Sequence, residues 1–129
     1  MPPRPMRILV VEDEAGVAEV LSGLLGQLGH TAEVAGGGQE ALERVEAFSY
    51  DLLIVDFKMP GMSGRRLWEA LRDRGSPLAR RLAFMSGNAR SPELVELVRE
   101  AASLTLPKPF TFEDVSALLR EAGRRFESS

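Results

Sequence analysis

The chain has 129 residues, of which 44% are hydrophobic and 27% are charged, and its formal net charge is −3; these values are typical of one soluble globular domain. It has no cysteine, which excludes disulfides and thiolate metal sites. We find no basic tail or stripe, no apolar run that would span a bilayer and no signal peptide, so we expect a cytoplasmic protein that binds neither nucleic acid nor membrane.

Short apolar segments alternate with helical patterns along the chain. Residues 8–11, 52–55 and 82–85 are unbroken apolar runs, which is the pattern of parallel strands covered on both faces. Residues 104–106 predict another strand of the same sheet. Residues 31–35 mix polar with apolar side chains and therefore predict an edge strand.

Apolar residues at helical spacing predict five helices, one after each strand. The first has its apolar stripe within residues 17–28, and Gly29 follows as a C-cap. Ser91, directly before a proline, predicts an N-cap, and Thr111 with Asp114 predicts a capping box.

Five β–α units in succession predict an α/β fold, namely a doubly wound five-stranded parallel sheet with helices on both faces. Such folds place functional sites at the carboxyl ends of the strands, beside the point where the strand order reverses. We expect residues 1–6 to form a disordered lead, residues 7–125 the domain and residues 126–129 a short tail.

Several polar residues are interpreted as structural or surface residues without a role in a functional site. His30, the only histidine, follows a helix end and is interpreted as a surface or cap residue. The arginine pairs at 65–66, 80–81 and 124–125 are interpreted as solvated helix or loop faces. Glu14 is interpreted as a solvated residue of a helix start, where acidic side chains are favoured.

Acidic residues follow two of the predicted strands: Glu12 and Asp13 follow the first, and Asp56 follows the third. If these strands are neighbours, the carboxylates meet at one edge, where two like charges about 4 Å apart cost roughly 1 to 4 kcal/mol. A divalent cation such as magnesium would offset this repulsion. Ser86 and Lys108 follow at the ends of the fourth and fifth strands, and the whole set complements a phosphoryl group accepted by Asp56.

Four blocks of the sequence resemble those of bacterial two-component receiver domains. They read RILVVEDE at 7–14, DLLIVDFKMPGMSG at 51–64, FMSG at 84–87 and LPKPF at 106–110. The resemblance covers nearly the whole chain and implies the flavodoxin-like strand order 2-1-3-4-5. It also implies a role in a phosphorelay, either as a stand-alone response regulator or as a receiver module of a hybrid histidine kinase.

The resemblance implies a magnesium or manganese ion held by four residues. Asp13 and Asp56 match the carboxylates that bind the metal directly. Glu12 matches the neighbour that acts through a metal-bound water, and Lys58 matches the position whose backbone carbonyl completes the metal's ligands.

The resemblance also assigns roles around the phosphoryl group. Asp56 matches the phospho-acceptor, Ser86 the switch hydroxyl and Lys108 the lysine that pairs with the phosphate. It implies a cis peptide bond between Lys108 and Pro109. The family usually carries Tyr or Phe three residues before the lysine, whereas this chain has Thr105, so we expect its readout to use another surface or to depend on Ser86 alone.

The implied phosphodonor is a phosphohistidine on a sensor histidine kinase or a histidine phosphotransfer protein, or a small donor such as acetyl phosphate. The domain would catalyse its own phosphorylation and slow dephosphorylation without being an enzyme for an outside substrate. We expect a monomer or weak homodimer that contacts a downstream protein.

Three other functions compete with this interpretation. A haloacid-dehalogenase-like phosphotransferase needs a second aspartate two residues after its nucleophile, and position 58 is lysine. A flavin-binding electron carrier needs a phosphate-binding loop where this chain has acidic residues. A pseudo-receiver that binds a partner without phosphorylation is kept open by Thr105.

Overall fold

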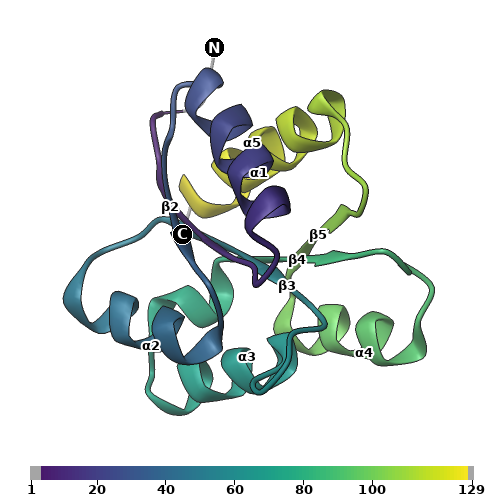
Figure 1. Ribbon diagram of the computed structural model, residues 1–129. Coiled ribbons are helices and arrows are strands. Elements are labelled where there is room, and N and C mark those ends of the chain that lie inside the picture. The colour runs from purple at the N-terminus through teal and green to yellow at the C-terminus, as the bar shows by residue number, and fades with distance from the viewer. Residues whose placement is uncertain (1–3, 128–129) are drawn as a thin grey trace.

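The computed structural model describes residues 4–127, in which strands and helices alternate along the chain (Figure 1). Residues 1–3 of the predicted lead and residues 128–129 of the predicted tail lie outside the described part. The tail assignment of residues 126–127 is wrong, because the last helix continues to Glu127 and Phe126 packs against the core. The strands are β1 (Arg7–Val11), β2 (Thr31–Ala35), β3 (Leu52–Asp56), β4 (Leu82–Ser86) and β5 (Leu104–Pro107). The helices are α1 (Ala15–Gln27), α2 (Gly38–Ala47), α3 (Gly64–Asp73), α4 (Pro92–Ala101) and α5 (Phe112–Glu127), with a short 3-10 helix, η1 (Pro77–Arg80).

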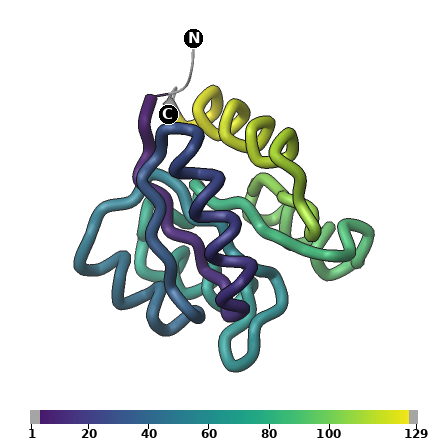
Figure 2. Tube along the Cα trace, turned by 45° about the horizontal axis from the view of Figure 1, so that its top comes forward, coloured from purple at the N-terminus to yellow at the C-terminus, as the bar shows by residue number. Residues whose placement is uncertain are grey.

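All neighbouring strands are parallel, and their order is β2-β1-β3-β4-β5, which confirms the predicted doubly wound sheet. β2 lies at an edge, as its mixed composition predicts. Helices α1 and α5 cover one face of the sheet, and α2, α3 and α4 cover the other (Figure 1). Figure 2 shows that the start of β1 and the end of α5 lie at the same end of the molecule.

Alternation along each buried strand divides the core between the two faces of the sheet. In β1, Ile8 and Val10 pack toward α1 and α5, whereas Leu9 and Val11 pack toward α2, α3 and α4. β3 repeats this alternation in register with β1. The unbroken apolar runs are therefore explained by burial on both faces.

The predicted helix ends are confirmed. Gly29 has φ +93°, a left-handed conformation that glycine adopts without strain, just after α1. The Ser91 hydroxyl accepts a hydrogen bond from the N–H of Leu94 at the start of α4. Thr111 and Asp114 each donate a backbone N–H to the other's side chain, at 2.8 and 3.1 Å.

His30 is buried, which corrects its interpretation as a surface or cap residue. Only 7% of it is exposed, and its Nδ1 accepts a hydrogen bond from the N–H of Met6 at 2.9 Å. Burial lowers the pKa of His30, so the neutral ring that this hydrogen bond requires is favoured. Met6 itself packs against the cluster beneath α1 and α5, so residue 6 is part of the fold although it was assigned to the lead.

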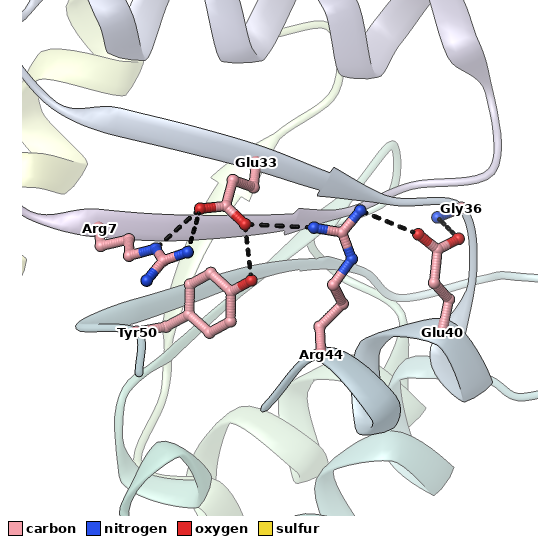
Figure 3. Close-up of polar contacts among 6 residues, drawn as sticks. All are labelled: Arg7, Glu33, Gly36, Glu40, Arg44 and Tyr50. Carbon is pink, nitrogen blue, oxygen red and sulfur yellow. Dashed lines mark hydrogen bonds and ion pairs between the residues drawn. The ribbon is translucent and has the colours of Figure 1, made fainter. Parts of the chain in front are cut away.

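A polar network holds the edge strand β2 to the rest of the sheet (Figure 3). Glu33 of β2 accepts hydrogen bonds from Arg7 Nε at 2.7 Å, Tyr50 Oη at 2.9 Å and Arg44 Nη1 at 3.2 Å. The Arg7 guanidinium also lies over the rings of Phe48 and Tyr50, 5.0 and 5.1 Å from their centroids. One carboxylate thus joins β2 to β1, to α2 and to the segment before β3.

Replacing Glu33 with glutamine is expected to lower the free energy of unfolding by about 1–2 kcal/mol, since charge-assisted hydrogen bonds are lost from a partly exposed site. Burial alone would raise the pKa of Glu33, but hydrogen bonds from Arg7 and Tyr50 and the charges of Arg7 and Arg44 hold it below its ordinary value of 4.5. The stabilisation is therefore present above that value and lost as the pH falls through the folded-state pKa.

Urea denaturation at neutral and acidic pH measures this effect. Glu19→Gln, a change of the same chemistry at an exposed position of α1, is the control and should leave the urea midpoint unchanged. Equal losses in the two variants would contradict the assigned role of Glu33.

Candidate functional site

The register of β1 with β3 brings two carboxylates to the same edge of the sheet. Val11 pairs with Val55, so Glu12 and Asp56, which come next, leave the sheet side by side. Glu12 is 1% exposed and Asp56 is 5% exposed, whereas Asp13 is exposed to solvent. One carboxylate oxygen from each of these three residues lies within 4.8 Å of the other two.

Lys108 supplies the cation that contacts this acidic cluster. Its Nζ donates to Glu12 Oε1 at 2.8 Å and to Asp56 Oδ2 at 3.3 Å, and it lies 3.7 Å from Glu14 Oε1. The backbone N–H of Lys108 donates to the carbonyl of Ser86 at 2.9 Å, which extends the pairing of β5 with β4. Three carboxylates therefore contact one ammonium, and Asp13 adds a fourth acidic side chain to the cluster, so that acidic groups outnumber the basic group.

Two further predicted residues lie at this edge in different ways. The backbone N–H of Lys58 points at Asp56 Oδ1, 3.4 Å away, while the lysine side chain is exposed. Ser86 ends β4, and its Oγ accepts a hydrogen bond from the N–H of Asn88 at 3.0 Å, not from a group of the acidic cluster. The peptide bond between Lys108 and Pro109 is cis, as the resemblance implied.

The electrostatics of the cluster appear in two pKa shifts. Burial, together with the neighbouring Asp56 carboxylate, raises the pKa of Glu12 to about 7, although Lys108 opposes this shift. Burial alone would lower the pKa of Lys108, but the hydrogen bond to Glu12 and the charges of Asp56 and Glu12 outweigh it and raise the pKa above its ordinary value. The raised pKa of Lys108 and the contribution of Asp56 to the Glu12 shift both reflect the negative charge gathered around this lysine.

A hard divalent cation fits this donor set. The ligand atoms are all carboxylate oxygens, which magnesium and manganese accept. The exposed Asp13 leaves one side of the cluster open to solvent, so a cation there would keep water molecules among its ligands. A cation there would also lessen the repulsion between Glu12 and Asp56, which contributes to the raised pKa of Glu12.

Sequence reasoning missed two contributors to the site. Glu14 is exposed at the N-cap of α1, which confirms its assignment to a solvated helix start, but its Oε1 also lies 3.7 Å from Lys108 Nζ; its position two residues after Glu12 was the available signal. Gly64 begins α3 so close to the loop after Asp56 that a Cβ atom there would lie 3.1 Å from the Asp56 carbonyl oxygen and from Phe57 Cα. The close approach of α3 to this loop has no local signature in the sequence.

These features define a class of protein, the flavodoxin-like α/β domains that carry an acidic cluster suited to a cation, together with a lysine. Both lie where the strand order of the sheet reverses. The family model for the response regulator receiver domain matches residues 8–120. The chain belongs to this family, whose members are signalling domains of two-component systems.

Relatives and solved structures agree with this assignment. The two-component response regulator PhoP of Pseudomonas aeruginosa is 37% identical over 120 residues, which cover 93% of this chain and 52% of that protein. The response regulator MprA of Mycobacterium ulcerans is 35% identical over 120 residues, or 93% of this chain and 51% of that protein. A sensor protein from Polaromonas sp. JS666 superposes with a TM-score of 0.83 at 32% identity, covering 96% of this chain and 99% of that one.

The chain spans about half the length of the curated relatives that it matches. The similarity therefore concerns the receiver part of those proteins. Within residues 4–127, none of the helices combines the length and the apolar character needed to cross a bilayer.

Proposed function

We propose that this domain accepts a phosphoryl group onto Asp56 in a magnesium-dependent reaction and thereby switches its contacts with other proteins. The observation that carries the proposal is the cluster of three carboxylates within 4.8 Å, with Lys108 bonded to two of them. Carboxylates this close repel one another, and a bound cation would offset that repulsion and attract an anionic phosphoryl group.

The proposed chemistry begins with the Asp56 carboxylate as nucleophile. One of its oxygens attacks the phosphorus atom of a phosphohistidine, an O–P bond forms, and the electron pair of the broken P–N bond leaves with the donor imidazole. Lys108 Nζ, already 3.3 Å from Asp56 Oδ2, is placed to donate to an oxygen of the transferred group. Ser86 would donate its hydroxyl proton to another phosphoryl oxygen.

Magnesium, held by Asp13 and Asp56 with Glu12 acting through water and the Lys58 carbonyl as a further ligand, would neutralise charge on the transferred group. Asp13 and Glu12 act in this proposal by placing negative oxygens around the cation. Lys58 acts through its backbone, which its exposed side chain and its N–H contact with Asp56 support.

The proposed donors are a sensor histidine kinase, a histidine phosphotransfer protein or acetyl phosphate, and the domain catalyses its own phosphorylation and hydrolysis. We place it in the cytoplasm, as a monomer or weak homodimer with a downstream protein target. The chain spans about half the length of its relatives, so the proposal concerns the receiver domain and not the activity of a larger protein. Thr105 is exposed on β5, and we propose that the readout does not depend on a ring at this position.

Intact-mass spectrometry after incubation with acetyl phosphate and magnesium tests the proposal. The native chain should gain one phosphoryl group, Asp56→Asn should gain none, and chelation should prevent the gain. Asp51→Asn, at the opposite end of β3, is the matched control and should still be phosphorylated. A folded native chain that stays unmodified would instead favour the pseudo-receiver, and a phosphorylated Asp56→Asn variant would refute the acceptor assignment.

A further inference from the structure

A cleft of about 870 Å³ lies at the end of the sheet where the strands begin, opposite to the end that carries Asp56. Its position follows from β4, which ends at Ser86 beside the acidic cluster and is preceded by Arg81 in the cleft wall. The ends of α3, α4 and α5 and the helix η1 form the other walls. The volume lies within the range of roughly 300–1,000 Å³ that is typical of sites for small ligands.

The cleft is basic in a chain whose net charge is negative. Four arginines line it, and Glu100 is the one acidic residue among the lining side chains that the structure describes. Glu100 is itself paired with Arg65 Nη1 at 3.4 Å, and Arg72 Nε is paired with Asp73 Oδ1 at 3.1 Å. Basic side chains outnumber acidic ones among the lining residues. The arginines come from α3, from the segment around η1 and from α5: Arg72, Arg80, Arg81 and Arg125.

The guanidinium groups of two of these arginines lie over aromatic rings. The Arg72 guanidinium lies 4.8 Å from the centroid of Trp68, and that of Arg81 lies 5.7 Å from the centroid of Phe126. Arg81 also donates to the carbonyl of Phe126 at 3.4 Å, and Arg125 donates to the carbonyl of Ala102 at 3.1 Å. These backbone contacts orient the guanidinium groups, which lowers the entropy that a ligand would have to remove.

We propose that this cleft binds a nucleotide. Arginine forks match phosphate oxygens in a bidentate geometry, and guanidinium groups and aromatic rings are planar groups on which a base can stack. A purely acidic peptide would use the charge of the cleft but not these planar groups, and so the cleft favours a ligand with both phosphates and a planar ring. The proposal does not depend on phosphorylation of Asp56.

Calorimetric titration of the chain with ATP tests this proposal, with a chelator present so that the acidic cluster cannot bind the nucleotide through a metal. Trp68 is the only tryptophan, so its indole N–H gives a single reporter in nuclear magnetic resonance spectra, and it lines the cleft. ATP is expected to bind, to shift this signal and to bind more tightly than pyrophosphate, whereas adenosine should not bind. Asp56→Asn should bind ATP as the native chain does.

Arg80→Gln is expected to weaken ATP binding about tenfold, the value of one charge-assisted hydrogen bond. Arg66→Gln is the matched control, because Arg66 is exposed on α3 but does not line the cleft. Equal weakening in both variants would reduce the effect to overall charge and overturn the proposal. The proposal would also be overturned if ATP did not bind, or if pyrophosphate and ATP bound with equal affinity. Displacement of ATP by an equal concentration of a poly-glutamate peptide would overturn it too, because it would assign the cleft to acidic protein segments.

Discussion

Replacing Lys108 with glutamine is expected to slow phosphorylation of Asp56 by about 10²- to 10³-fold, the typical effect of removing one preorganised donor to a developing negative charge. The same change is expected to strengthen magnesium binding by about tenfold. Lys108 now competes with any cation for Glu12 and Asp56, with contacts of 2.8 and 3.3 Å, and its removal leaves those carboxylates without that partner. The two effects therefore have opposite signs.

Mass-spectrometric time courses with acetyl phosphate measure the first effect, and calorimetric titration with magnesium measures the second. Lys58→Gln is the control, because the Lys58 side chain is exposed and only the backbone carbonyl of this residue is proposed to bind the metal. It should change neither quantity by more than about twofold, the size of a surface-charge effect. Weaker magnesium binding in Lys108→Gln would show that the lysine organises the cluster instead of competing for it.

Replacing Phe84 with alanine is expected to lower the free energy of unfolding by about 3–5 kcal/mol. Phe84 is 0% exposed, lies in the middle of β4 and packs with Leu53, Val55 and other residues beneath α2, α3 and α4. Its ring also meets that of Phe57 edge to face, with centroids 6.5 Å apart and planes at 78°. Truncation would leave a cavity one strand away from the phospho-acceptor, where the rigid sheet has little freedom to collapse.

Urea or thermal denaturation measures this loss. Phe112→Ala makes the same chemical change at a residue that is 48% exposed at the start of α5, and it should cost less than about 1 kcal/mol. If the two variants lost similar stability, the assignment of Phe84 to the tightly packed core would be wrong.

Local sequence patterns were sufficient for the elements and for most of the candidate site. The apolar runs at 8–11 and 52–55 predicted doubly buried strands because side chains on both faces of a parallel sheet avoid water. The cap residues Ser91 and Thr111 predicted helix starts because their hydroxyls satisfy backbone N–H groups nearby in the chain. The acidic residues after β1 and β3 meet because the carboxyl ends of neighbouring parallel strands share an edge.

Residues whose surroundings come from distant segments were interpreted less well. His30 looked like a helix-end residue, but the N–H of Met6 and the packing beneath α1 bury it. Glu14 is solvated at the start of α1, as interpreted, but the sequence did not indicate that Lys108, from the far end of the chain, lies within 3.7 Å of it. Spacing along the sequence carries no information about such meetings, since they depend on how the helices close over the sheet.

The sequence by itself determined the α/β class and the identity of the carboxylates and lysine at the strand ends, because these depend on periodicity or on position relative to a strand. The strand order came from the resemblance to the receiver family. Only the tertiary structure decided the Glu33 network, the contact of α3 with the loop after Asp56 and the basic cleft between the ends of three helices. Three of the four arginines of that cleft, Arg80, Arg81 and Arg125, were interpreted as solvated faces. A one-dimensional pattern shows that a residue is charged, but not which other charges the packing of distant helix ends will bring beside it.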